Sequence, residues 1–381
     1  MPVDTVELGR KLKRMREQLQ LGLGDVASAT GIPEDLLAQF ESGMKTPYGD
    51  HVLILADYFR CDYRFLISNE RLTAIEQTEQ MFRKHGSAFS VEDRWAVQEF
   101  LYLCDCEHWL QQELGRVPVG DFVPTMTGRY YKGHAEQVAQ QLRTYFGYGP
   151  NEQRLDVFSD YRRLGLHLFR RRLPNSDISG VFIRHPAIGK CVLVNYTEDV
   201  FRQRFTASHE VAHALFDGET DFVVSFVVDS KELAEVRANT FASRFLLPPE
   251  FLERISDSRN WSDGKVLHWA ARLMVNPEVL AYALNDAGLI GDQQKRDFAR
   301  LKIPIAEKPD PELPAGLSPQ SLSRRQHLLE MGVSHHYATL CFDAYDRGLV
   351  SAGRLSEMLL ADYAGLPEIA HVCGRPLQHN G

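Results

Sequence analysis

The sequence lacks the features that would carry the chain out of the cell or into a membrane. Its first ten residues, MPVDTVELGR, contain no apolar core of a signal peptide, and no apolar run anywhere is long enough to span a bilayer. The six cysteines include no C-x-x-C pair, which favours reduced and mostly buried thiols over a disulfide framework. We therefore expect a cytoplasmic protein with no membrane partner.

An excess of basic charge is also missing. The chain has 43 Lys and Arg against 51 Asp and Glu, which gives a formal net charge of −8. This balance excludes broad electrostatic attraction to nucleic acid, so any DNA binding must depend on a local patch. With 381 residues, 44% of them hydrophobic and 25% charged, the chain is long enough for two or three globular domains.

The strongest motif in the sequence is TASHEVAHALFDG, over Thr206–Gly218. His209 and His213 are four residues apart and would meet on one face of a helix, with Glu210 at the edge of that face. Two imidazoles at this spacing can bind Zn²⁺, and a third protein ligand would leave one position for water. Glu210 could then act as the base that takes a proton from this water.

A second helix is predicted over Lys231–Pro249, where apolar residues recur at helical spacing until a pair of prolines ends it. Glu235 shares a face with Ala238 and Ala242, whose small side chains would let the motif helix come close. Glu235 is therefore the third metal ligand that we favour. The alternatives nearby in the sequence are Asp217, Glu219, Asp221, Asp229 and Glu232.

Three segments together carry a resemblance to a known family: Arg202–His213 (RQRFTASHEVAH), Glu235–Ala242 (EVRANTFA) and Leu246–Pro248 (LLP). Over about residues 135–290 the chain resembles the ImmA/IrrE family of bacterial zinc metallopeptidases. The resemblance implies that His209, His213 and Glu235 bind zinc and that Glu210 is the general base. It also implies a substrate, because family members commonly cleave a helix-turn-helix repressor encoded nearby and so derepress stress-response, mobile-element or defence genes.

Residues 5–67 have the spacing of a helix-turn-helix domain, with short helices expected over Gly22–Thr30 and Pro33–Ser42 around a turn at Gly31. The stretch GRKLKRMREQLQLGLGDVASATGIPEDLLAQFESGMKTP resembles the XRE (Cro/repressor-like) family, in its L-x-x-x-R opening and its E-x-G ending. The resemblance implies an all-α domain whose third helix reads the major groove of DNA.

The candidate DNA-contacting positions are Glu34, Asp35, Gln39 and Lys45. Two carboxylates facing a phosphate-lined groove are repulsive, which departs from the family pattern. Two interpretations therefore stay open. The domain binds DNA, or it keeps the fold for protein contact and pairs with a true repressor that it delivers to the peptidase.

The fold class predicted is α+β, mainly α, with a zincin-like peptidase domain that contains a small antiparallel sheet. Val192 and Val194 on its strands would lie in the core, or beside an extended substrate if their strand is at an edge. The expected order is a helix-turn-helix domain at 1–69, a helical connector at 70–115, a linker at 116–133, the peptidase at 134–302, a proline-rich linker at 303–319 and a C-terminal helical domain at 320–381. The connector could supply a dimer surface for a homodimer.

The sequence thus favours a zinc metalloendopeptidase that acts on a repressor protein, with Zn²⁺ as its cofactor. One alternative is a DNA-binding transcriptional regulator with a sensory or self-cleaving peptidase domain. Another is a protease toxin or defence effector with a broader intracellular target.

Overall fold

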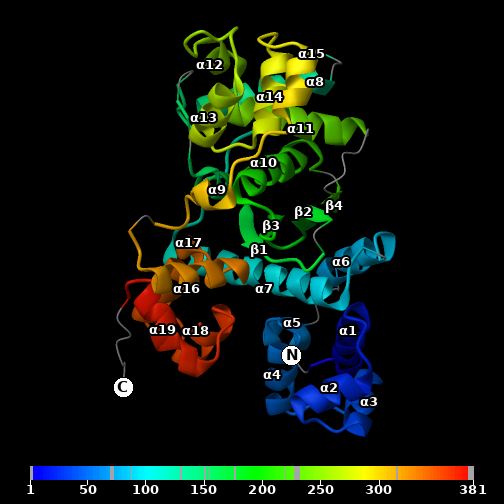
Figure 1. The fold of residues 1–381 in the computed structure, drawn as a ribbon. Coiled ribbons are helices and arrows are strands. Elements are labelled where there is room, and N and C mark those ends of the chain that lie inside the picture. Colours follow the sequence, from blue (N-terminus) through cyan, green and yellow to red (C-terminus); the bar gives the residue numbers. More distant parts are fainter. Residues whose placement is uncertain are drawn as a thin grey trace.

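Figure 1 shows the computed structural model as an elongated molecule with helices at both ends and a small sheet near its middle. The structure describes residues 3–68, 73–86, 88–128, 131–149, 152–153, 155–175, 177–218, 220–226, 232–314 and 316–375. In this part of the chain no helix is long and apolar enough to cross a membrane. The six cysteines, all within it, are free.

Five short helices form the N-terminal unit, at one end of the molecule (Figure 1). They are α1 (Thr5–Gln18), α2 (Leu23–Thr30), α3 (Glu34–Glu41), α4 (Gly49–Tyr58) and α5 (Tyr63–Ile67). Gly31 has a φ of 72° and ends α2, which lets the chain turn into α3. Buried apolar side chains such as Leu12, Phe40 and Leu55 form a separate core for this unit. The helices predicted from the spacing are confirmed.

The long helix α7 (Val91–Leu114) crosses the middle of the molecule and follows α6 (Thr73–Lys84). Ser90 is its N-cap, because the Ser90 hydroxyl accepts a hydrogen bond from the Asp93 N–H. Gly115, with a φ of 65°, ends the helix.

The sheet has four strands in the order β1-β3-β2-β4. They are β1 (His167–Arg171), β2 (Ile178–His185), β3 (Gly189–Asn195) and β4 (Phe222–Phe226). β2 pairs antiparallel with β3 and with β4, but β1 pairs parallel with β3. The sheet is therefore mixed, and the prediction of an antiparallel sheet is wrong in this respect. The physical reason is that β1 lies beside β3 and not beside β2, so two strands with the same direction become neighbours.

Both faces of the sheet are covered. Val192 and Val194 on one face pack with helices that lie between residues 131 and 246, whereas Cys191 and Leu193 on the other face pack with α7. Val192 and Val194 are fully buried, and β3 has a neighbour on each side. Their interpretation as core residues is confirmed, and β3 offers no free edge to a substrate.

The helices α8 (Tyr131–Tyr145), α9 (Val157–Arg162), α10 (Val200–Phe216) and α11 (Leu233–Leu246) lie on the face of the sheet opposite α7 (Figure 1). Helix α11 packs against both α8 and α10. A further group of helices follows and has its own core: α12 (Pro249–Glu253), α13 (Asp263–Leu273), α14 (Pro277–Asp286) and α15 (Asp292–Phe298).

The segment after α15 contains the short 3₁₀ helix η1 (Ile305–Glu307) and is attached to β1 and α9. Arg170 donates to Asp310 at 2.7 Å and forms an ion pair with Glu312 at 3.0 Å, and Arg162 donates to Glu312 at 2.7 Å. These buried contacts fix the position of the proline-rich segment beside β1.

The C-terminal helices share a core with α7 and with one face of the sheet. They are α16 (Pro319–Glu330), α17 (His335–Asp346), α18 (Ala352–Met358), the 3₁₀ helix η2 (Tyr363–Gly365) and α19 (Leu366–Val372). Figure 1 shows α16 and α17 beside α7. The boundaries of the six predicted segments stay predictions.

Candidate metal centre and helix-turn-helix surface

Helix α10 places the motif between the sheet and α11. Asp199 begins the helix, since its side chain accepts from the N–H groups of Phe201 and Arg202. The sheet lies on one side of α10 and α11 on another, so most residues of α10 are buried. For this reason the helix has no clear polar face. This burial fixes the directions of His209 and His213.

His209, His213 and Glu235 converge on one point. The two Nε2 atoms are 3.1 Å apart, His209 Nε2 is 3.2 Å from Glu235 Oε2, and His213 Nε2 is 3.3 Å from Glu235 Oε1. Among the described residues, this is the group of three or more His, Cys, Asp or Glu side chains whose ligand atoms lie close enough to hold a metal ion. The structure thus brings together the three residues expected to act as ligands.

The other ring nitrogen of each histidine is held by a second side chain. Nδ1 of His213 donates to Asp217 Oδ2 at 2.8 Å, and Nδ1 of His209 donates to Asn239 Oδ1 at 2.9 Å. Asp217 also accepts from Arg237. With Nδ1 engaged in this way, each Nε2 is directed at the cluster.

The charges in the cluster shift the pKa of its members. Burial lowers the pKa of His213, but hydrogen bonds to Asp217 and Glu235 outweigh it and raise this pKa to about 9. Burial raises the pKa of Glu235, but hydrogen bonds from His209 and His213 to the carboxylate outweigh this effect. The pKa of Glu235 therefore lies well below its ordinary value. A cation at this point therefore competes with a proton on His213.

Glu210 lies next to the cluster and is fully buried. Neither carboxylate oxygen makes a hydrogen bond of standard geometry within the described residues. Burial raises the pKa of the carboxyl group, against the opposing effects of His209, His213 and the Ser225 hydroxyl. Gly180 on β2 makes room for it, because a Cβ atom there would lie 2.7 Å from Glu210 Oε1. A buried, unpaired carboxylate with a raised pKa has the properties of a general base or acid.

The alternatives to Glu235 lie elsewhere or have other partners. Asp217 is the hydrogen-bond partner of His213 Nδ1, and Asp221 accepts from Gln77 and forms an ion pair with Arg184 at 3.6 Å. Glu232 is exposed at the N-terminus of α11. Glu219 and Asp229 lie outside the described residues.

At the other end of the molecule, Glu34, Asp35, Gln39 and Lys45 are all exposed on α3 and just after it. Two basic residues of α1 are engaged within the domain and are not available for contacts with DNA. Lys11 is fully buried and donates to the carbonyls of Phe65 and Ser68, at 2.6 Å each. Arg16 forms a two-pronged ion pair with Glu41, at 2.7 and 2.8 Å.

A histidine pair on one helix, a carboxylate from a second helix and a buried acid beside them define a peptidase-type protein, here with a helix-turn-helix unit at its far end. Comparison with known families agrees. Residues 161–285 match the peptidase family M78 model, described as an IrrE N-terminal-like domain. Residues 7–63 match a model described as a helix-turn-helix domain. No curated protein matches the chain.

The two matches confirm the resemblance that the motifs predict, a helix-turn-helix domain followed by an ImmA/IrrE-type peptidase domain.

Sequence reasoning missed the roles of several residues around the cluster. Asp217 follows His213 by four residues and Asn239 follows Glu235 by four, so helical spacing could have identified both as outer partners. Gly180 and the Tyr161 hydroxyl, which donates to Ser208 at 2.7 Å, come from distant segments and leave no signal in the sequence.

Proposed function

We propose that the chain is a zinc-dependent endopeptidase that cleaves a helix-turn-helix transcriptional repressor and so derepresses stress, mobile-element or defence genes. The observation that carries the proposal is the convergence of His209, His213 and Glu235 beside the buried Glu210.

The donor set fits zinc. Two imidazole nitrogens and a carboxylate oxygen are ligands that Zn²⁺ accepts, and three protein ligands are typical of catalytic sites that keep one position open. Asp217 and Asn239 would hold the two imidazoles in the tautomer that binds a metal through Nε2. Bound zinc supplies a Lewis acid that activates water and polarises a carbonyl.

The residues of the chain then have separate roles. His209, His213 and Glu235 would hold the metal. Glu210 would take a proton from the attacking water, and its raised pKa makes it a stronger proton acceptor than an ordinary carboxylate. The close packing of β2 and α11 around α10 would keep these groups in place.

The helix-turn-helix domain supports the choice of substrate. Its fold is that of a repressor, and its exposed α3 begins with Glu34 and Asp35, which disfavour the approach of a phosphate backbone. We propose that this domain pairs with a repressor and delivers it to the peptidase domain.

The test measures zinc content and cleavage together. Wild type, Glu210→Gln, His213→Ala and the exposed control Glu253→Gln are purified and incubated with the repressor from the neighbouring gene. We expect about one zinc per chain and cleavage for wild type and Glu253→Gln, zinc without cleavage for Glu210→Gln, and loss of both for His213→Ala. Cleavage by Glu210→Gln at the wild-type rate would contradict the mechanism.

A second candidate is a DNA-binding regulator, favoured by the helix-turn-helix match and the outward-facing α3. The two functions separate in the Glu210→Gln variant. A regulator that acts by binding alone would keep its effect on gene expression in this variant, whereas a peptidase would lose it.

A further inference from the structure

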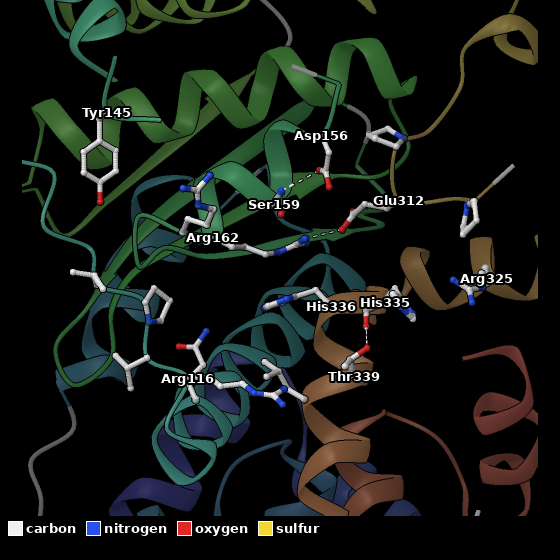
Figure 2. A pocket seen from close by; sticks show the side chains of 18 residues that line it. Arg116, Tyr145, Asp156, Ser159, Arg162, Glu312, Arg325, His335, His336 and Thr339 are labelled. Atoms are coloured by element: carbon white, nitrogen blue, oxygen red, sulfur yellow. Dashed lines mark hydrogen bonds and ion pairs between the residues drawn. The ribbon is translucent and has the colours of Figure 1, made fainter. Parts of the chain in front are cut away.

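A cavity of about 810 Å³ lies apart from the metal centre, where three parts of the chain meet (Figure 2). Its walls come from the end of α7 and the segment after it, from α9 of the peptidase unit, from the proline-containing segment 311–314, and from α16 and α17. A cavity of this volume is within the range of small-molecule sites, which often lie between domains.

The lining of the cavity is cationic. It contains four arginines and two carboxylates: Arg116, Arg162, Arg163 and Arg325, with Asp156 and Glu312. Arg116 and Arg163 form ion pairs with Asp343 and Asp160, at 2.5 and 3.6 Å, so the excess of positive charge rests on Arg325. Arg325 donates to the carbonyl of Val372 at 3.1 and 2.8 Å and has no ion-pair partner among the described residues. Its charge is thus free to attract an anion.

Arg162 supplies an unused donor. Only 6% of its surface is exposed, and it donates to Glu312 at 2.7 Å and to the carbonyl of Leu168 at 3.3 Å. Its Nη2 atom is buried and has no hydrogen-bond partner in the described part of the chain. A buried donor without a partner costs about 1–3 kcal/mol, which an anionic ligand would relieve.

The cavity is chemically different at its two ends. Figure 2 shows Arg325 and His335 at one end and Tyr145 at the other. Pro118 and Val119 add apolar surface to the lining. One end suits an anionic group and the other an aromatic or apolar ring. We propose that this cavity binds a small phosphorylated molecule with a ring, of the size of a mononucleotide.

Helix α9 connects this cavity to the metal centre. Ser159, Arg162 and Arg163 line the cavity, and Tyr161 between them donates to Ser208 Oγ at 2.7 Å. Ser208 directly precedes His209 on α10. A ligand that shifts α9 therefore acts on the metal helix through a buried hydrogen bond, so the cavity is a regulatory site for the peptidase. This regulatory role rests on the proposed function, whereas binding of the ligand does not.

The binding test uses inorganic phosphate and adenosine 5′-monophosphate as probes, with full-length protein and calorimetry. We compare wild type with Arg325→Gln and with Arg324→Gln, a neighbour on the same helix that pairs with Glu368 outside the cavity. Saturable binding that weakens at least tenfold in Arg325→Gln and less than twofold in Arg324→Gln is expected. No saturable binding of either probe, or equal weakening in both variants, would overturn the site. Thermal unfolding verifies that both variants are folded.

The regulatory test adds the nucleotide to the repressor cleavage assay. We expect a change in rate of at least threefold for wild type and none for Tyr161→Phe, which lacks the hydroxyl to Ser208 but should bind the nucleotide with an affinity within twofold of wild type. An unchanged wild-type rate at saturating nucleotide overturns the regulatory role. If wild type cleaves nothing, the proposed function fails while calorimetry still decides the binding site.

Discussion

Single residues around Glu210 determine how much space its carboxylate has. Gly180 lies at a register shift in β2, and a Cβ atom there would come within 2.9 Å of Thr206 Cγ2 as well as 2.7 Å of Glu210 Oε1. Contacts under 3.0 Å require something to move. The absence of a side chain at Gly180 is therefore a condition for the position of Glu210.

Under the proposed function, Gly180→Ala should retain zinc and lose activity. The added methyl group would displace Glu210, so we expect a fall of at least tenfold in cleavage and a loss of about 1–3 kcal/mol in the free energy of unfolding. Zinc content, cleavage rate and urea unfolding test this expectation. Gly264→Ala is the control, because a Cβ atom at Gly264 meets nothing within 4 Å. Equal behaviour of the two variants would refute the explanation.

Asp105 on α7 gives a pH-dependent prediction. Burial and the negative charge of Asp62 raise the pKa of Asp105 to about 7 in the folded protein, against 3.8 for an ordinary Asp. The folded state therefore prefers the protonated acid. The contribution of this group to stability is fully present below pH 3.8 and is lost as the pH rises to about 7.

Asp105→Asn should therefore be more stable than wild type at pH 8, by at most about 4 kcal/mol, because each pKa unit corresponds to 1.36 kcal/mol. At pH 4 the free energies of unfolding of the two proteins should differ much less. Urea unfolding at both pH values measures this difference. A gain that is the same at pH 4 and pH 8 would show that ionisation of Asp105 is not the cause.

At the scale of single elements, one buried lysine fixes α5 against α1. Lys11 Nζ donates to the carbonyls of Phe65 and Ser68 near the end of α5, and it lies 4.6 Å from the centre of the Phe65 ring. These carbonyls have few other ways to be satisfied at a helix end. Lys11, one of the basic residues of α1, thus has a structural role.

Lys11→Met should destabilise the helix-turn-helix unit by about 1–3 kcal/mol, since it removes the ammonium donor from the carbonyls of Phe65 and Ser68 and leaves only the Ser68 hydroxyl as a donor to Phe65. Lys13→Met on the same helix is the matched control, because 54% of the Lys13 side chain is exposed. Hydrogen exchange of α1 and α5 would locate the loss. Similar protection from hydrogen exchange in both variants would mean that the Lys11 contacts add little to the stability of this unit.

At the scale of the whole molecule, α7, the sheet and the C-terminal helices share one hydrophobic core. The same sheet packs against α10 on its other face, so only the sheet separates the C-terminal helices from α10. Unfolding of the C-terminal helices would expose apolar surface on α7 and on the sheet. We therefore expect these parts to unfold together.

Leu340→Ala on α17 tests this cooperativity. Leu340 is 3% exposed, so its truncation should cost about 2–5 kcal/mol, whereas Leu349→Ala, at a residue 40% exposed, should cost much less. Unfolding of Leu340→Ala, followed by far-ultraviolet circular dichroism and by zinc release, should show one shifted transition for both probes. Loss of C-terminal structure while zinc stays bound would contradict cooperative unfolding.

The sequence was sufficient to predict the fold class and the metal-binding candidates. Helical spacing placed His209, Glu210 and His213 on one helix, and the small residues after Glu235 predicted the close approach of α11 that is observed. It was not sufficient for the sheet, because strand order depends on which strands become neighbours after folding. It also gave no sign that Lys11 is buried, since a lysine on a helix is usually solvated.

The sequence by itself determined the local features: the spacing of the histidines, the turn at Gly31, the cap at Ser90 and the two domain types. These depend on residues a few positions apart, whose geometry is set by the backbone. Only the tertiary structure decided that β1 pairs with β3, that Gly180 makes room for Glu210, and that Arg162 and Arg325 line one cavity. The physical reason is that these contacts join segments far apart in the chain, and their formation depends on the packing of the whole core.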